Sequence, residues 1–487
     1  MRLTRRGMIM GAASTLATGA AAEPLATSLR PVARNMTVGW SARKIARARL
    51  SGDVGFVIAD AQTGEVLEAV APDMPLPPAS VAKTFTSLYA IETLGQGHRF
   101  TTRVLADGPI YNGILHGNLI LAGGGDPNLV TDDLAVLCSA MKDSGLHEVK
   151  GDFLVWDNAL VNLDEIDTTQ LDYLGYNPSV TGLNLNFNRV HFEWKRQEEE
   201  IVTVLDARSA RYKPVVTTSR MEVVDRPHPV FTYRDAGEVD EWTVAQRFLN
   251  DAGSRWLPVR HPALYAGEVF ATFARSHGII LKQPQEIADV PDGRVLAAYD
   301  SAPLTDMLRG LLDYSTNITA EAVGLAATVA RTGQHRGLHT SAMGMARWAS
   351  SRVDGIAPYF VDHSGLGDGS RVAARDMVRL LVAPDVRPAL HPILKDIPWL
   401  GQNGAAQRPQ DGQLRAKTGT LNFVCGLAGY LRTAGGRDLA FAMFAADLAA
   451  REEGIRRGGE RPPGARRWNT AARNLQRELL QHWARAV

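Results

Sequence analysis

The chain has 487 residues, which is long for a single hydrophobic core and predicts about two or three domains. Hydrophobic residues make up 45% of the sequence and charged residues 22%, proportions that are typical of a soluble globular protein. The formal net charge is +1 at pH 7, whereas binding to nucleic-acid phosphates needs a clear cationic excess. We therefore expect no nucleic-acid partner.

The first 22 residues predict an export signal peptide. Basic residues come first, an uncharged and weakly apolar stretch follows over residues 7–18, and Ala20, Ala21 and Ala22 supply a small-residue cleavage site. The Arg5-Arg6 pair resembles a twin-arginine signal, so we expect export by that route to the periplasm, with a disordered basic start as the alternative. No later stretch offers the ~18 uninterrupted apolar residues of a spanning helix, so we expect no transmembrane segment in the mature protein.

The sequence holds two cysteines, Cys138 and Cys425, and both lie among apolar residues. An exported protein could join them in a disulfide, but their apolar neighbours favour two buried free thiols. We expect neither to be a metal ligand or a nucleophile.

Strand and helix patterns divide the mature chain into a discontinuous part and an insertion. Residues 54–59 and 65–70 are typical of a β-hairpin, and apolar residues at helical spacing predict a helix over residues 81–94. Over residues 99–289, strand patterns separated by charged and Pro-containing turns predict a β-rich inserted region. The expected discontinuous domain therefore covers residues 23–98 and 290–487.

The second segment of that domain begins with an amphipathic helix pattern over residues 304–312. Strand patterns follow over residues 414–417, 422–430 and 439–445. The final helix places apolar residues, including Trp468 and Trp483, along one side. We expect this side to dock on the sheet rather than on a membrane surface.

Three short polar motifs stand in order along the chain, and the first is Ser80-Val81-Ala82-Lys83. A helix that begins at Ser80 places the hydroxyl at the positive end of the helix dipole, and the i, i+3 spacing places Lys83 beside it. Apolar neighbours would remove water from the lysine, and a partly neutral amine can accept the serine proton. The motif indicates an activated nucleophile, although this spacing on a helix surface is usually a solvated pair.

The second motif is Ser315-Thr316-Asn317 and the third is Lys417-Thr418-Gly419-Thr420. Ser315 and Asn317 offer a hydroxyl and an amide from a turn between two helices, groups that can relay a proton and bind a substrate amide. In the third motif the cation and hydroxyl can hold a carboxylate, and Gly419 allows a peptide backbone to approach closely. The N–H groups of Thr420 and Ser80 could together bind an oxyanion. Taken alone, the third motif would be an ordinary turn.

Together the motifs resemble the S-x-x-K, S-x-N and K-T-G signature of penicillin-binding proteins and serine β-lactamases. Residues 121–127 (Leu-Ala-Gly-Gly-Gly-Asp-Pro), 315–321 (Ser-Thr-Asn-Ile-Thr-Ala-Glu) and 362–366 (Asp-His-Ser-Gly-Leu) are similar to the low-molecular-mass class C D-alanyl-D-alanine carboxypeptidase/endopeptidase family. The likeness covers nearly the whole mature chain. The long stretch between Lys83 and Ser315 also fits this family, whereas β-lactamases have a short one there.

The resemblance implies an α/β protein of the α+β kind, with the penicillin-binding/serine β-lactamase-like transpeptidase fold: a five-stranded antiparallel sheet flanked by helices, with a large β-rich insertion of two nested subdomains. It implies a serine D-Ala-D-Ala carboxypeptidase whose partners are peptidoglycan stem peptides and β-lactams, without a cofactor. The implied roles are acylation for Ser80, proton acceptance for Lys83, proton transfer for Ser315, electrostatic binding for Lys417, and substrate binding for Asn317, Thr418, Gly419 and Thr420.

Several residues depart from the family pattern or suggest other functions. Thr316 stands where the family often has Asp, and His363 and the run Gly367-Asp368-Gly369 are less usual. A β-lactamase or esterase of the same fold, and a non-catalytic cell-wall-binding protein, are the alternatives. His335 and His339 could form a metal pair, but Gly337 lies between them and no helical acid accompanies them, so we expect no metal.

Overall fold

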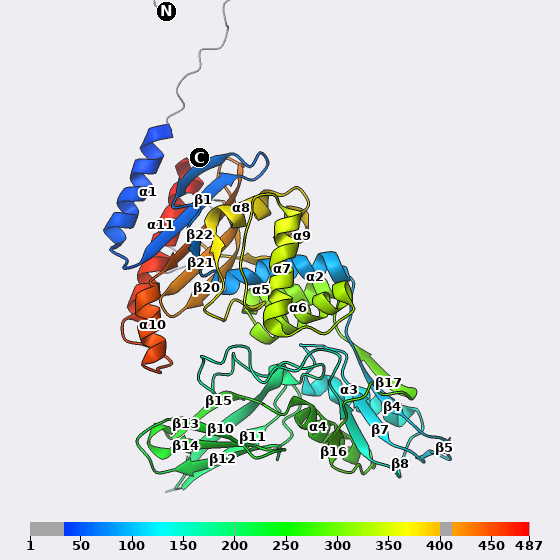
Figure 1. Ribbon diagram of the computed structural model, residues 1–487. Coiled ribbons are helices and arrows are strands. Elements are labelled where there is room, and N and C mark those ends of the chain that lie inside the picture. Colours follow the sequence, from blue (N-terminus) through cyan, green and yellow to red (C-terminus); the bar gives the residue numbers. More distant parts are fainter. Residues whose placement is uncertain (1–33, 199, 400–411, 487) are drawn as a thin grey trace, which may run out of the picture.

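The computed structural model describes residues 34–198, 200–399 and 412–486. Figure 1 shows them as two bodies, one built on a large sheet and one made of several smaller sheets. The expected signal peptide over residues 1–22 lies outside the described residues. Within the described ranges, no helix is both long enough and apolar enough to cross a bilayer.

A six-stranded antiparallel sheet forms the centre of the first body, with the strand order β19-β20-β21-β22-β1-β2. It has one strand more than the five that the resemblance implied, and its edge strand β19 is only two residues long. The expected N-terminal hairpin and the three strands near the C-terminus are confirmed, and they meet where β1 pairs with β22. The strands are β1 (Asp53–Asp60), β2 (Val66–Val70), β19 (Lys395–Asp396), β20 (Gln413–Leu421), β21 (Val424–Arg432) and β22 (Asp438–Ala446). β21 is buried along almost its whole length, which explains its run of small and apolar residues.

Helices cover both faces of this sheet (Figure 1). One face carries α1 (Arg34–Ala48) and α11 (Ala465–Ala486), which pack on the sheet through a core that includes Leu479 and Trp483. The expected docking of the final helix is therefore confirmed. The other face carries η1 (Ala79–Val81), α2 (Ala82–Leu94), α5 (Leu304–Tyr314), α6 (Asn317–Thr332), α7 (Leu338–Arg352), α8 (Ala374–Val382), α9 (Val386–Leu390) and η4 (His391–Ile393). The two-residue strands β3 (Pro75–Leu76) and β18 (Val372–Ala373) pair with each other, and α10 (Leu448–Arg456) follows β22.

The second body is the β-rich region expected from the sequence. Its largest sheet has the order β16-β9-β7-β4-β17, and three-stranded sheets have the orders β11-β10-β15, β12-β14-β13 and β5-β6-β8. One buried core runs between these sheets and two helices, α3 (Thr131–Asp143) and α4 (Pro262–Ser276). The other elements are β4 (Thr101–Ala106), β5 (Ile110–Tyr111), β6 (Ile114–Leu115), β7 (Leu119–Ala122), β8 (Glu148–Val149), β9 (Phe153–Trp156), η2 (Asn186–Asn188), β10 (Arg189–Gln197), β11 (Glu200–Asp206), β12 (Ser219–Val224), β13 (Phe231–Asp235), β14 (Asp240–Ala245), η3 (Gln246–Phe248), β15 (Ala252–Pro258), β16 (Pro284–Glu286) and β17 (Arg294–Asp300).

The chain enters and leaves this region side by side. β17 pairs antiparallel with β4, and just beyond them the N–H of Ser301 donates to the carbonyl of Phe100 at 2.9 Å. β17 lies after the boundary at 289/290 expected from the sequence, yet it pairs with β4 and so belongs to the sheet of the inserted region. The division into residues 23–98 with 290–487 and an insertion of two nested subdomains stays a prediction.

Both cysteines are buried free thiols, as expected. Burial raises the pKa of Cys138 to about 12 and that of Cys425 to about 11. Neither thiol is therefore ionised near neutral pH.

Trp483 offers a test of the contact between α11 and the sheet. The side chain is fully buried, and its indole N–H donates to Oε2 of buried Glu68 at 2.8 Å. Trp483→Ala should lower the free energy of unfolding by about 3–5 kcal/mol because it leaves a cavity. Trp483→Phe should cost about 1–3 kcal/mol because it mainly removes a donor from a buried carboxylate.

Denaturant unfolding measures both changes. Trp468→Phe is the matched control, because its indole donates to an uncharged carbonyl, that of Ser51, at 3.0 Å. The control should be less destabilised than Trp483→Phe. An equal loss in the free energy of unfolding would show that the bond to Glu68 stabilises the protein no more than a bond to an uncharged carbonyl.

Candidate active site

The first polar motif lies at the junction between the sheet and α2. Ala79, Ser80 and Val81 form the short turn η1, and α2 continues from Ala82. Ala79 has φ of 46°, a left-handed conformation that is unusual for alanine. This turn holds the half-buried Ser80 side chain at the N-terminal end of the helix, as the sequence predicted.

Lys83 is fully buried and contacts three oxygen atoms from three separate segments. Its Nζ donates to Oγ of Ser80 at 3.0 Å, to Oδ1 of Asn317 at 2.8 Å and to the carbonyl of Ser364 at 2.7 Å. Burial lowers the pKa of Lys83 to about 8, and nearby Glu321 and Asp362 partly oppose that shift. Near neutral pH the lysine is therefore close to losing its proton.

The second and third motifs meet at Ser315. This residue caps α5 in the left-handed conformation, with φ of 61°, and α6 begins two residues later at Asn317. Nζ of Lys417, on β20, donates to Oγ of Ser315 at 3.0 Å. Burial, together with the neighbouring Lys83, lowers the pKa of Lys417 to about 7.

The rest of the third motif lies along the edge of β20. β19 pairs with β20 only at Arg415 and Ala416, so within the described residues no strand pairs on the outer side of Thr418, Gly419 and Thr420. A Cβ added to Gly419 would lie 2.6 Å from the carbonyl oxygen of Pro78 and 3.0 Å from the nitrogen of Ser80. The sequence suggested that Gly419 gives a substrate backbone room, but the backbone that approaches it is the chain's own nucleophile turn.

Two buried carboxylates support the loop that contacts Lys83. Glu321 of α6 accepts the N–H of His363 and of Ser364, each at 2.9 Å, and Asp362 accepts those of Gly365 and Gly367 at 2.6 Å. Burial and the neighbouring Asp362 raise the pKa of Glu321 to about 8, and burial also raises the pKa of Asp362. Glu321 thus fixes the peptide segment whose carbonyl accepts from Lys83.

His363 anchors the same loop from behind. Its Nε2 bonds to Oγ of Ser341 at 2.8 Å, and Ser341 bonds in turn to Thr328 at 2.6 Å. Burial lowers the pKa of His363 to about 3, so the ring is neutral. A Cβ on Gly324 would lie 2.2 Å from the imidazole, so only glycine leaves room for this ring.

An open cleft of about 400 Å³ lies in front of these groups. It is lined by Ser80, Gln170, Tyr176, Ser315, Asn317, Gly365, Leu366, Thr420, Leu421, Asn422, Arg451, Glu460, Arg461 and Asn469. Tyr176 and Gln170 come from the inserted region, and the carbonyl of Tyr176 accepts Nδ2 of Asn317 at 2.8 Å. The cleft is therefore built from both bodies of the molecule.

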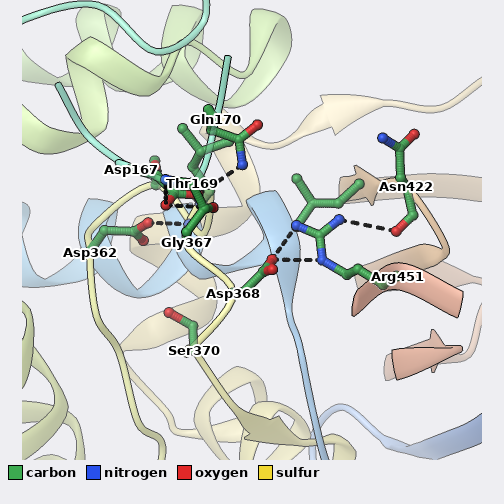
Figure 2. Close-up of polar contacts among 12 residues, drawn as sticks. Asp167, Thr169, Gln170, Asp362, Gly367, Asp368, Ser370, Asn422 and Arg451 are labelled. Atoms are coloured by element: carbon green, nitrogen blue, oxygen red, sulfur yellow. Dashed lines mark hydrogen bonds and ion pairs between the residues drawn. The ribbon is translucent and has the colours of Figure 1, made fainter. Parts of the chain in front are cut away.

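Figure 2 shows the ion pair beside this cleft. Nε of Arg451, on α10, donates to Asp368 at 2.6 Å, and Nη1 donates to the carbonyl of Asn422 at 3.0 Å. Arg451 is almost fully buried, so Asp368 compensates a cation that has lost most of its contact with water. The pair ties the loop after Ser364 to the turn that follows β20.

The structure joins Lys83 to Ser80 and Asn317 by hydrogen bonds, and it joins Lys417 to Ser315. Ser80, Ser315, Asn317 and Thr420 line the cleft together. No role was predicted from the sequence for Ser364, Glu321, Tyr176 or Arg451. Glu321 could have been noticed, because an acid within the otherwise apolar segment around it implies a buried partner. No local signal marks the Tyr176 carbonyl, because its position depends on how the inserted region folds back.

The arrangement defines a serine acyl-enzyme peptidase of the penicillin-binding type. The D-Ala-D-Ala carboxypeptidase 3 (S13) family matches residues 42–458, and the chain belongs to that family. A D-alanyl-D-alanine carboxypeptidase from Actinomadura sp. (strain R39) is 26% identical over 424 residues, which cover 80% of this chain and 77% of the relative. The D-alanyl-D-alanine carboxypeptidase DacB of Haemophilus influenzae is 25% identical over 416 residues, 80% of this chain and 85% of the relative.

Solved structures show the same fold. Penicillin-binding protein 4 (dacB) from Haemophilus influenzae has a TM-score of 0.71 and 20% identity, over 91% of this chain and 99% of that one. The same protein complexed with a novel β-lactam has a TM-score of 0.70 and 21% identity. The expected α+β penicillin-binding fold and the class C resemblance are confirmed.

Glu321→Gln tests how the buried carboxylate affects Lys83. A glutamine offers one acceptor oxygen, so one of the two N–H groups at His363 and Ser364 loses its partner, and the free energy of unfolding should fall by about 1–3 kcal/mol. Because Glu321 raises the pKa of Lys83, the substitution should also lower that pKa. NMR of labelled lysine side chains as a function of pH measures it.

Glu268→Gln is the matched control. The Glu268 carboxylate also accepts two neighbouring backbone N–H groups, those of Thr217 and Thr218 at 2.7 and 3.0 Å, but in the inserted region. The control should leave the pKa of Lys83 unchanged. An equal shift in both variants, or none in Glu321→Gln, would contradict the coupling.

Proposed function

We propose that this protein cleaves D-alanyl amide bonds of peptidoglycan stem peptides through an acyl ester on Ser80. It acts before a terminal D-alanine as a carboxypeptidase and at a D-alanine cross-link as an endopeptidase. The observation that carries the proposal is the contact of 3.0 Å between Nζ of Lys83 and Oγ of Ser80, in a site where burial brings the pKa of the lysine to about 8. A neutral amine at that distance can accept the hydroxyl proton as the oxygen attacks.

Acylation then follows from the positions of the neighbouring groups. Oγ of Ser80 attacks the carbonyl carbon of the scissile amide, and its proton passes to Nζ of Lys83. The oxyanion of the tetrahedral intermediate accepts the N–H groups of Ser80 and Thr420. When the C–N bond breaks, the departing D-alanine amine takes a proton through Ser315, and water later hydrolyses the ester and regenerates the serine.

The remaining motif residues bind the substrate in this proposal. Lys417 supplies positive charge for the terminal carboxylate, with Thr418 and Thr420 beside it on the open edge of β20. Nδ2 of Asn317 donates to a substrate carbonyl. Gly419 contributes indirectly, because its missing side chain brings β20 against the turn of Ser80. β-Lactams, whose ring amide resembles the scissile bond, acylate the same serine.

We also propose that the protein works in the periplasm after export. The arginine pair and the small-residue site before residue 23 support this assignment, and the twin-arginine route fits the weakly apolar stretch between them. Peptidoglycan lies in that compartment, so the location agrees with the substrate.

Labelling with a fluorescent penicillin tests the nucleophile. The label should map to the peptide that contains Ser80, and Ser80→Ala should abolish it while the protein stays folded by circular dichroism. Lys83→Met should slow labelling by about a thousandfold or more, because proton transfer by a positioned base contributes factors of that order. Label on another serine would refute the assignment, and rapid turnover of the label would favour a β-lactamase.

The pH dependence of acylation tests the two lysines. Lys83 must be neutral, which favours pH values above its pKa of about 8, whereas Lys417 must be charged, which favours values below its pKa of about 7. The second-order rate constant of acylation by penicillin should therefore be bell-shaped, with a maximum between these two values. Lys417→Arg should remove the alkaline limb, because guanidinium stays protonated. A wild-type profile without an acidic limb would contradict the role of Lys83.

A further inference from the structure

The outward surface of α11 carries a concentration of positive charge. The helix contains five arginines and a single acidic residue, whereas the formal net charge of the whole chain is +1. Its apolar side is used by the sheet, because Leu475, Leu479 and Trp483 are buried there. The arginines therefore lie on the side that the fold leaves exposed.

Three of these arginines share one line along the helix with a residue of the cleft. Arg466, Asn469, Arg473 and Arg477 follow each other at spacings of three, four and four residues, which places them on one face. Asn469 lines the cleft, and its Nδ2 donates to the carbonyl of Leu421 at the end of β20 at 2.9 Å. The line of Arg466, Arg473 and Arg477, here called the arginine row, therefore begins beside the catalytic cleft and extends along α11 for roughly 16 Å.

The charge of the arginine row is not compensated locally. Within the described residues neither Arg466 nor Arg473 has a carboxylate partner, and Arg477 bonds to the uncharged amide oxygen of Asn474 at 3.1 Å. The one acidic residue of the helix, Glu478, lies on another side and binds Lys44 of α1 at 2.9 Å. In the cleft itself, Arg461 adds a further cation and Glu460 contacts Arg255 at 3.3 Å.

We propose that the arginine row is a docking track for the anionic peptidoglycan polymer outside the scissile stem peptide. This inference rests on the proposed function, because successive stem peptides on a glycan strand carry free carboxylates. When one stem peptide of a glycan strand enters the cleft, the carboxylates of the neighbouring stem peptides would lie along α11. The track would raise the affinity for polymeric substrate while leaving the chemistry at Ser80 unchanged.

An anionic membrane is the competing partner for such a surface, and two observations favour the polymer. The apolar side of α11 is buried against the sheet, so the helix has no apolar face left to insert between lipids. The row also begins at the cleft, which a polymeric substrate has to reach and a bilayer does not.

The test compares two variants that each lose three positive charges. The first is Arg466→Gln/Arg473→Gln/Arg477→Gln. The matched control is Arg43→Gln/Arg47→Gln/Arg49→Gln, which changes exposed arginines in or just after α1, off the row. Three measurements are made on each: acylation by penicillin, D-alanine release from a short soluble peptide, and D-alanine release from and pelleting with purified sacculi at low and high salt.

The row variant should keep wild-type acylation and short-peptide turnover. Its KM on sacculi should rise about tenfold with kcat unchanged, because exposed charge pairs are individually weak and salt-screened. High salt should reduce wild-type pelleting to the level of the variant, and the control should behave as wild type.

Three outcomes would overturn the proposal. The first is an unchanged KM on sacculi in the row variant, and the second is an equal rise in KM in both triple variants. The third is a row variant that still binds sacculi but no longer binds vesicles made of equal parts of phosphatidylglycerol and phosphatidylcholine. Failure of wild-type acylation at Ser80 would instead refute the proposed function, so the two failures are distinguishable.

Discussion

The burial of Lys83 is the constraint on which the rest of the site depends. A buried lysine is stable inside the protein only if oxygen atoms accept hydrogen bonds from its amine. Here the three acceptor oxygens come from the nucleophile turn, the start of α6 and the loop at Ser364. The start of α6 and the loop at Ser364 lie 234 and 281 residues after Lys83 in the sequence. The lysine can be satisfied only when all three are in place, so assembly of the site and completion of the first body are one event.

The loop at Ser364 is held more firmly than its irregular backbone suggests. Two buried carboxylates accept its N–H groups, and a neutral histidine fixes it from behind. Burial disfavours the charged form of each group, so it raises the pKa of Glu321 and lowers that of Lys83, and the neighbouring Asp362 raises the pKa of Glu321 further. The same groups therefore determine both the shape of the loop and the protonation of the amine.

The sequence predicted those parts of the protein that depend on local patterns. Strand-like runs bounded by turn residues predicted the hairpin and the C-terminal strands, apolar residues at helical spacing predicted α5 and α11, and the motif spacing indicated Ser80 with Lys83. It could not place the carbonyl of Tyr176 or the pair of Arg451 with Asp368, because these contacts join segments that lie far apart in the sequence. Gly419 shows a related difficulty. The sequence indicated that a backbone approaches this glycine closely, but it did not show that this backbone is the turn at Ser80.

The bond between Asn317 and the carbonyl of Tyr176 has a thermodynamic consequence. Any ligand that accepts the same amide hydrogen has to displace this carbonyl, so the inserted region behaves as an internal competitor whose effective concentration is set by chain connectivity. The measured affinity then contains the free energy of releasing the segment around Tyr176. Substitutions in that segment can change ligand affinity even where the ligand never touches them.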